Sequence, residues 1–322
     1  MERCALELHV DGAWTERAAL PCPSGPTRLL IAGDVGLPTE TLRLTLLGAQ
    51  SWCGEHGCDL GLLPGDILYD DGVRAAQHWS AIWGGGFRRL GFPFLAALGN
   101  HEYRHEENPH LKREVLYATD GKDGFVLPSS SYAARLQDPA GKTLLAIAAV
   151  DTDSVANPGD GMPGLGDAAL ETACGTGAPV VWLGHHPLSS QGLHHLHEAQ
   201  VESSLRATLA KAIDGGCSVA FAAAGHDHDL QAYGPGCQEP GAPAVVVGGP
   251  SGRGFRGRGS THLTPCPGDG DAVTRYFGGP SLAGGFAWVA VAASGEVEVR
   301  LVEASKDGVR VLSTDRWSVG GD

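Results

Sequence analysis

VAFAAAGHDH (residues 219–228) places six apolar residues directly before a glycine and two histidines. Four further apolar runs end in the same way: residues 29–32 before Gly33-Asp34, 60–64 before Gly65-Asp66, 94–98 before Gly99-Asn100-His101, and 180–183 before Gly184-His185. Short uninterrupted apolar runs predict buried strands. Ligands of open α/β sheets bind beyond the carboxyl ends of such strands, where glycine lets the chain turn sharply. The sequence therefore predicts five strand ends that bring carboxylates, an amide and imidazoles to one rim.

The amino-acid composition and net charge limit the fold classes and functions that the chain can have. The chain has 322 residues, which is enough for one large core or for two domains. The 48 glycines and 20 prolines favour a loop-rich α/β fold over a helical bundle. The net charge of -14 argues against a general nucleic-acid binder, which needs a basic face. A small phosphate ester remains a possible substrate, because metal cations supply local positive charge.

Several features bear on compartment and partners. No stretch has 18 consecutive apolar residues, so we expect no membrane span. The start, MERCA, lacks the pattern of a signal peptide, which favours a cytoplasmic protein, or a secreted or periplasmic one if a signal has been removed. Among eight cysteines, Cys53 and Cys58 flank His56 and could form a disulfide or a metal clip. Structural cysteines, unpaired or locally paired, are the favoured interpretation. The sequence does not indicate the oligomeric state.

The organisation along the chain fits one α/β domain with two sheets over residues 28–322, preceded by an extended lead-in over 1–27. Apolar spacing and end signals predict helices over 39–49, 72–83, 167–173 and 199–213. Further strands are expected over 143–150 and 244–247, and residues 286–291, 296–302 and 309–312 predict an antiparallel meander. Residues 101–140 and 248–283 are interpreted as loops.

The polar residues at the five strand ends form the donor set of a two-metal site. Two neighbouring cations need a shared anionic ligand to offset their repulsion, and imidazole, carboxylate and amide groups suit the remaining positions. The candidates are Asp34, Asp66, Asn100, His185, His226 and His228. Each motif alone is more typical of a turn, a helix cap or a hydrogen-bonded surface histidine. The five motifs in one order favour the metal site.

The motif order GD, GDxxY, GNHE, GHxP and GHxH resembles the calcineurin-like metallophosphoesterases. Tyr69, three residues after Asp66, is typical of the purple acid phosphatases within them. GHDHDLQ (225–231), GGFAW (284–288) and VEAS (302–305) are similar to segments of the small tartrate-resistant, mammalian-type acid phosphatases. The resemblance extends from about residue 28 to 312. It implies a two-sheet α/β/β/α sandwich of the metallophosphoesterase type, with the metal site at the carboxyl ends of the strands.

The resemblance also implies a role for each ligand. The first metal would be held by Asp34, Tyr69 and His228, the second by Asn100, His185 and His226, and Asp66 would bridge them. A phenolate favours a trivalent ion, so Fe3+ is expected at the Tyr69 site, with Fe2+, Zn2+ or Mn2+ at the other. The alternative for Tyr69 is a ring packed under the loop with a hydrogen-bonded hydroxyl.

Two histidines are candidates for the substrate side. His101 follows Asn100 and could protonate the leaving oxygen or hold a phosphate oxygen; the alternative is a rim histidine bonded to a carboxylate. His194 lies nine residues after His185, the offset of a second substrate-side histidine in the mammalian-type enzymes. The adjacent His195 and a plain loop histidine remain open alternatives.

The chain departs from the mammalian-type pattern at several positions. His186 replaces a tyrosine and is either a substrate contact or a spacer, and the cysteine pair of that group has no evident counterpart. Residues 101–127 are acidic, with Glu102 among them, and include His105 and His110. Arg253, Arg256 and Arg258 could bind a phosphate bidentately, but a flexible solvated loop is the favoured interpretation.

The resemblance and the motifs together predict a binuclear-metal phosphatase that hydrolyses small phosphate monoesters by attack of a metal-bound hydroxide, without a phosphoenzyme. A phosphodiesterase or nucleotide hydrolase with the same centre is the alternative, because pocket loops decide the leaving group. A non-catalytic binding module on this scaffold is disfavoured, because all seven ligand positions are filled.

Overall fold

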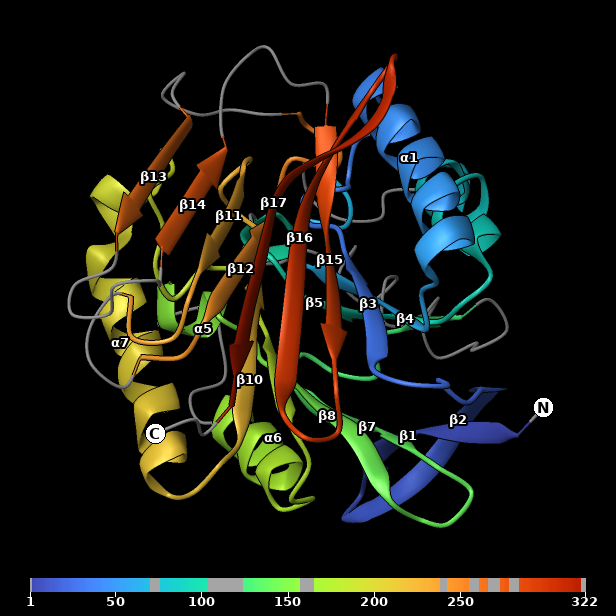
Figure 1. Ribbon diagram of the computed structural model, residues 1–322, viewed down its shortest axis with the longest axis vertical. Coiled ribbons are helices and arrows are strands. Elements are labelled where there is room, and N and C mark those ends of the chain that lie inside the picture. Colours follow the sequence, from blue (N-terminus) through green and yellow to red (C-terminus); the bar gives the residue numbers. More distant parts are fainter. Residues whose placement is uncertain are drawn as a thin grey trace.

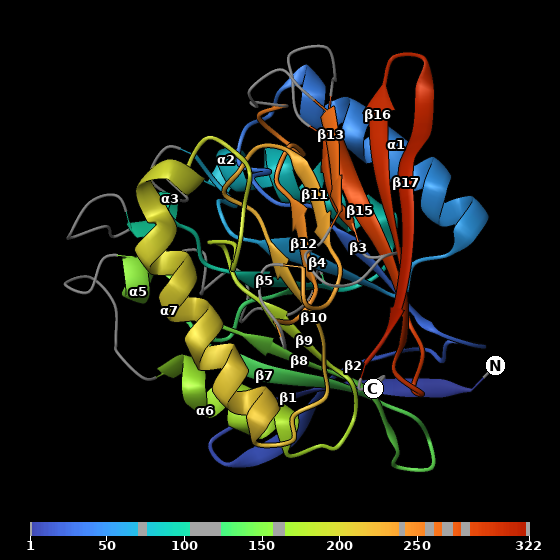
Figure 2. The same ribbon diagram turned by 60° about the vertical axis from the view of Figure 1, so that its left-hand side comes forward.

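The computed structural model describes residues 2–69, 76–103, 124–156, 165–237, 242–254, 261–265, 273–277 and 284–319. Within these ranges the chain forms two mixed sheets that face one another, with helices on both outer sides (Figure 1). Turned by 60°, the molecule shows strands between helices α1 (Glu40–His56) and α7 (His195–Asp214), which lie on opposite sides (Figure 2). The predicted two-sheet α/β/β/α sandwich is confirmed.

The first sheet has seven described strands. In spatial order they are β17 (Gly308–Ser318), β16 (Glu296–Ser305), β15 (Gly284–Val291), β3 (Thr27–Ile31), β4 (Leu60–Pro64), β5 (Phe94–Ala97) and β6 (Phe125–Val126). Strands β3 to β6 are parallel, whereas β15, β16 and β17 are antiparallel, and β15 joins them to β3. The predicted C-terminal meander is therefore confirmed, and it extends the parallel half of the sheet.

The second sheet has ten described strands. In spatial order they are β13 (Thr261–Pro265), β14 (Val273–Phe277), β11 (Leu230–Tyr233), β12 (Val245–Gly248), β10 (Val219–Ala224), β9 (Val180–Leu183), β8 (Thr143–Ala149), β7 (Tyr132–Gln137), β1 (Arg3–Val10) and β2 (Ala13–Pro21). Strands β8, β9, β10 and β12 are mutually parallel. The carboxyl ends of β9 and β10, together with those of β3, β4 and β5 in the first sheet, supply the residues of the predicted rim.

Helices cover the outer faces of the sheets. Besides α1 and α7 they are α2 (Ala76–Trp79), followed by a π-helical turn over Ser80–Gly84 and a 3-10 turn over Phe87–Leu90, then α3 (Asn100–Tyr103), α5 (Asp153–Ala156) and α6 (Leu165–Cys174). Helix α1 packs on β15 and β16, and α6 packs on β7 and β8. Thr39 caps α1 by accepting a bond from the Leu42 amide at 3.1 Å, as its sequence position predicts. None of the described helices is long and apolar enough to cross a membrane.

Apolar burial holds these layers together. The larger core lies between the two sheets and under α1, and a smaller one lies under α6 and α7. The fully apolar strands, such as Phe94–Ala97, are buried on both faces, which is why they carry no alternating pattern.

Two of the predicted loops are wrong in part. Within residues 101–140 the chain forms β6 and β7, and within 248–283 it forms β13 and β14. β7 lies between β1 and β8, and Tyr132, Ala133, Ala134 and Leu136 are buried there, which local sequence alone did not reveal. His105, His110, Arg256 and Arg258 lie outside the described residues.

The first 27 residues contain β1 and β2, which form a hairpin around the turn at Asp11-Gly12 and join the second sheet through β7. Whether this lead-in is separable from a domain over 28–322 stays a prediction. Disulfides link Cys4 to Cys22, Cys53 to Cys58 and Cys174 to Cys217, and Cys237 is also disulfide-bonded. Cys53 and Cys58 thus form a disulfide rather than a metal clip.

Candidate metal centre

Three of the predicted ligands have a left-handed backbone. Asp34, Asp66 and His226 have φ angles of 56°, 51° and 68°, and all three are buried. Each follows the glycine that ends an apolar strand. A left-handed residue other than glycine costs on the order of 1–3 kcal/mol and persists only where its surroundings hold it. Backbone strain is therefore concentrated where the predicted ligands lie.

One group of donor atoms surrounds Asp34. The Tyr69 hydroxyl donates to Asp34 Oδ1 at 2.9 Å and lies 3.4 Å from His228 Nε2. His228 Nε2 is 3.3 Å from the same Asp34 oxygen. A phenol, a carboxylate and an imidazole thus form a triangle small enough for one cation to contact all three.

A second group surrounds His185 Nε2. Asn100 Oδ1 lies 3.0 Å away, His226 Nδ1 3.2 Å away and Asp66 Oδ1 3.4 Å away. The ligand atoms of Asp34, Asp66 and His185 all lie within 4.8 Å of one another, so the two groups are adjacent. The structure brings all seven predicted ligand side chains together at one rim.

The hydrogen bonds of His185 test whether a cation fits there. Its Nδ1 lies 2.8 Å from the Pro64 carbonyl oxygen, which can only accept, so Nδ1 carries the hydrogen. In the neutral form that binds a metal, Nε2 would direct a lone pair at the Asp66 carboxylate, which also only accepts. A cation between these two acceptors removes their repulsion, and a carbonyl behind a ligating histidine is the usual support for a metal. The residues present fit a metal ion.

The pKa shifts of Asp66 and Tyr69 also fit a metal ion at this centre. Burial raises the pKa of Asp66, but in the metal-free site the positive charges of His185 and His101, when these rings are protonated, outweigh that effect and hold this pKa below its ordinary value. Burial, followed by the charges of Asp34 and Asp66, raises the pKa of Tyr69 well above its ordinary value. Tyr69 therefore becomes a phenolate only when a cation offsets the two carboxylates.

Glu102 is the residue that the motif reasoning missed. Its buried carboxylate accepts from the amides of Gly99 at 2.6 Å, Ile67 at 2.9 Å and Asp66 at 3.1 Å. It thereby joins the loop after β4 to the loop after β5, which carry three of the predicted ligands, Asp66, Tyr69 and Asn100. Burial and the charge of Asp66 raise the pKa of Glu102 well above its ordinary value. Its place in GNHE was the available signal, but the sequence suggested only an acidic loop.

Both substrate-side candidates lie at the rim. His101 Nε2 is 3.8 Å from Asp66 Oδ2, its amide donates to Asp66 Oδ1 at 3.1 Å, and its ring meets Tyr69 edge-on at 4.2 Å. The ring of His194, the residue before α7, lies 4.2 Å from that of His226. His186 is buried 4.6 Å from the His226 ring, and burial lowers its pKa well below the ordinary value.

Arg253 also reaches this centre. Its guanidinium carbon lies 4.2 Å from the centre of the Tyr69 ring. The neighbouring Gly252 carbonyl accepts from the Thr39 hydroxyl at 2.5 Å, and the Gly249 amide donates to the Asp229 carbonyl at 3.2 Å. This segment is packed against the rim, so the flexible-loop interpretation is wrong for Arg253.

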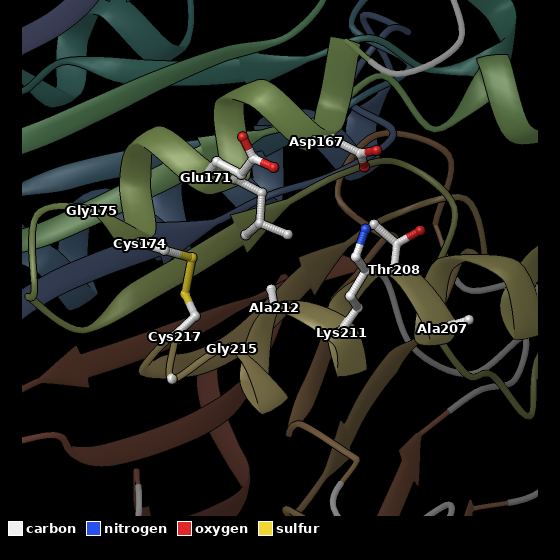
Figure 3. Close-up of a pocket in the computed structure, with 12 residues that line it drawn as sticks. Asp167, Glu171, Cys174, Gly175, Ala207, Thr208, Lys211, Ala212, Gly215 and Cys217 are labelled. Carbon is white, nitrogen blue, oxygen red and sulfur yellow. A yellow bond between two sulfur atoms is a disulfide. The ribbon is translucent and has the colours of Figure 1, made fainter.

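A separate cavity of about 640 Å³ lies between α6 and α7 (Figure 3). The Cys174–Cys217 disulfide, Asp167 and Lys211 are among its lining residues, and none of the predicted site residues is. This cavity is distinct from the candidate metal centre, and nothing in the structure indicates a ligand for it.

Comparisons with known proteins bear on the same centre. Residues 27–230, more than half of the chain, match the family model described as calcineurin-like phosphoesterase. No curated protein matches the chain. This matched region contains all the predicted metal ligands and both substrate-side histidines.

Two solved structures are similar in fold. One is GAP50, described as the anchor in the inner membrane complex of Plasmodium, with a TM-score of 0.66 and 15% identity, covering 92% of this chain and 90% of the other. The second is a dimetal phosphatase from Danio rerio, with a TM-score of 0.54 and 13% identity, covering 90% and 99%. At such low identity these likenesses show the fold alone.

Proposed function

The chain belongs to the calcineurin-like phosphoesterase family, and we propose that it is a two-metal phosphatase of the purple acid type that hydrolyses phosphate monoesters. The observation that carries the proposal is the pair of adjacent donor groups, one around Asp34 and one around His185. Both groups are complete, and the hydrogen bond from His185 to Pro64 leaves a lone pair that faces them.

Each donor group would hold one ion. Asp34, Tyr69 and His228 would hold Fe3+, and Asn100, His185 and His226 would hold Fe2+, Zn2+ or Mn2+, with Asp66 between them. The contact of Tyr69 with Asp34 and His228 supports the ferric assignment, because a phenolate is a hard anionic donor. When bound, two such ions lower the pKa of water and offset the charge of a phosphate.

The surrounding side chains supply proton transfer and positive charge. We assign His101 and His194 to the substrate side, where a ring N–H gives its proton to the leaving oxygen as the phosphorus–oxygen bond breaks. Arg253, stacked on Tyr69, adds a permanent cation. A monoester dianion gains more than a diester monoanion from these groups, which supports the monoesterase over a diesterase or nucleotide hydrolase.

A second candidate is a non-catalytic role on this scaffold. The fold similarity to GAP50, which is described as an anchor, is the observation that favours it. The complete set of seven donors favours catalysis, because a binding module has no need of buried, left-handed ligands.

Rates on a matched pair of esters test the proposal. The purified protein is assayed with 4-nitrophenyl phosphate and with bis(4-nitrophenyl) phosphate, and its metal content is measured on the same sample. We expect two metal ions per chain and a higher kcat/KM for the monoester. A faster diester reaction would favour the diesterase, and full metal loading without hydrolysis of either ester would favour the non-catalytic role.

A further inference from the structure

The loop that carries His194 is fastened to the strand end that carries two of the predicted ligands. Asp227, between His226 and His228, is fully buried. Its Oδ1 accepts from the His194 amide at 3.0 Å, and its Oδ2 accepts from the Ser190 hydroxyl. Both carboxylate oxygens of Asp227 therefore accept hydrogen bonds from the loop over residues 190–194.

Gly192 allows this close approach. A Cβ at Gly192 would overlap the Asp227 carboxylate. The Gly192 amide also donates to the Ser190 hydroxyl oxygen at 2.9 Å. The loop thus wraps around the carboxylate so tightly that only glycine fits at its tip.

Gln231 also forms hydrogen bonds with the same loop. Its amide nitrogen donates to the Ser190 hydroxyl at 2.8 Å, and its carbonyl oxygen accepts from the Gln191 amide at 2.9 Å. The Tyr233 hydroxyl donates to that carbonyl oxygen at 2.6 Å and fixes the orientation of the Gln231 amide. Because these groups are buried, each lost partner leaves a polar atom unsatisfied, so the network holds one arrangement.

His194 is the group that this network places. It is the residue before the 20-residue helix α7, and its ring lies 4.2 Å from that of His226 at a 42° angle. The Asp227 carboxylate accepts the backbone N–H at this helix start, where a negative charge is favourable. His194 is therefore held through its backbone while its ring stays at the rim.

We propose that Asp227, supported by Ser190 and Gln231, is a positioning residue that fixes His194 for proton donation to the leaving oxygen. The inference rests on the proposed function, since it assigns the leaving-group side of the same site. In that step the oxygen of water forms a bond to phosphorus, the ester phosphorus–oxygen bond breaks, and the His194 N–H proton passes to the departing oxygen. The proton lost by the attacking water goes to solvent, and His194 is reprotonated from solvent before the next turnover. Asp227 touches neither substrate nor metal in this assignment.

Leaving-group dependence tests the proposal. Asp227→Asn keeps the shape but presents an NH2 group to the donors of His194 or Ser190. Misplacement of a proton donor can cost roughly 10- to 100-fold in kcat, and this loss should appear with an alkyl phosphate, whose oxygen needs the proton. With 4-nitrophenyl phosphate, whose leaving group departs unprotonated, kcat should change by less than about threefold. His194→Ala should show the same pattern.

Two variants keep the test independent of folding. Ser190→Ala removes one donor to Asp227 and should give a smaller loss of the same kind if Asp227→Asn does not fold. Asp59→Asn is the matched control: Asp59 is also buried and accepts a backbone N–H, from Arg28 at 2.8 Å, at the opposite end of β4. It should lower stability without any dependence on the leaving group.

The outcomes separate the two claims. An active wild type whose Asp227→Asn and Ser190→Ala variants lose equal activity on both esters, or lose bound metal, would overturn the positioning role alone. A wild type with two metals and no hydrolysis of either ester would overturn the proposed function and this inference with it. Selective loss on the alkyl ester, with metal content unchanged, supports both.

Discussion

The metal rim and the C-terminal meander, two regions that meet at β3 and β15, are built in opposite ways. At the rim, Asp34, Asp66 and His226 hold buried polar groups on a left-handed backbone. In the meander, β15 pairs with β16 in unbroken register, and the buried Glu303 carboxylate accepts from the exposed Arg310 guanidinium at 2.8 Å. The rim holds strain and repulsion that a bound cation would relieve, whereas the meander supplies strand pairing, with one register shift between β16 and β17, and apolar burial.

This difference indicates that the residues needed for catalysis and those needed for stability lie in different parts of the molecule. A substitution at the rim should change chemistry more than stability, and one in the meander should do the reverse. Four substitutions test the contrast, in order of expected effect.

Asp66→Asn should abolish hydrolysis, by roughly 10³-fold or more, because it removes the carboxylate between the two ion sites and several kcal/mol of charge stabilisation. Asparagine tolerates the left-handed backbone, and the loss of attraction to His185 and His101 is offset in part by the loss of repulsion with Glu102, so the metal-free variant should lose less stability than Leu301→Ala. The measurements are the hydrolysis rate, the metal content, and thermal unfolding in the presence of a chelator that removes the metal. An unfolded variant would contradict the contrast between the two regions.

Leu301→Ala should do the opposite. Leu301 is fully buried on β16, and truncation of such a side chain costs about 2–5 kcal/mol. Chemical denaturation gives the free energy of unfolding. The kcat per metal-loaded molecule should stay within about twofold of the wild type, because β15 separates β16 from β3, which carries Asp34 at its end. A parallel fall in kcat would show that the two regions are coupled.

Arg253→Gln should have an intermediate effect confined to the rim. It removes a cation from the face of Tyr69, and such contacts are worth about 0.5–2 kcal/mol. We expect KM for a monoester to rise a few-fold while the unfolding free energy changes little. Arg300→Gln is the matched control, because Arg300 stacks 5.2 Å from Trp288 in the meander. Equal effects of the two substitutions on KM would refute a role for Arg253 at the site.

Glu298→Gln should have the smallest effect and a defined pH dependence. Burial raises the pKa of Glu298, but hydrogen bonds from Arg316 and Arg300 outweigh it and lower the pKa. A lowered folded-state pKa adds stability above the unfolded value, and this is lost as pH falls through the folded value. The unfolding free energy of the wild type should exceed that of the variant by less than about 1 kcal/mol at pH 7. The difference should shrink as pH falls below the ordinary glutamate pKa and vanish below the lowered folded-state pKa. A difference that persists in acid would contradict this origin.

The contrast also explains what the sequence could predict. The meander follows from alternating residues, and the rim follows from apolar runs that end in glycine and a ligand, because both signals are local. Glu102 and Asp227 could not be assigned in the same way. Apart from Gly99, their partners named above lie 33 to 37 positions away in the chain, and only the packed strands bring them together. Strand β7 escaped prediction for the same reason, since β1 and β8 bury it.

The most direct test of the account is metal analysis of the purified protein together with its visible spectrum. The account predicts two metal ions per chain, at least one of them iron, and a phenolate-to-iron absorption band that Tyr69→Phe removes. An active, fully loaded and colourless protein whose Tyr69→Phe variant keeps its metals would contradict it.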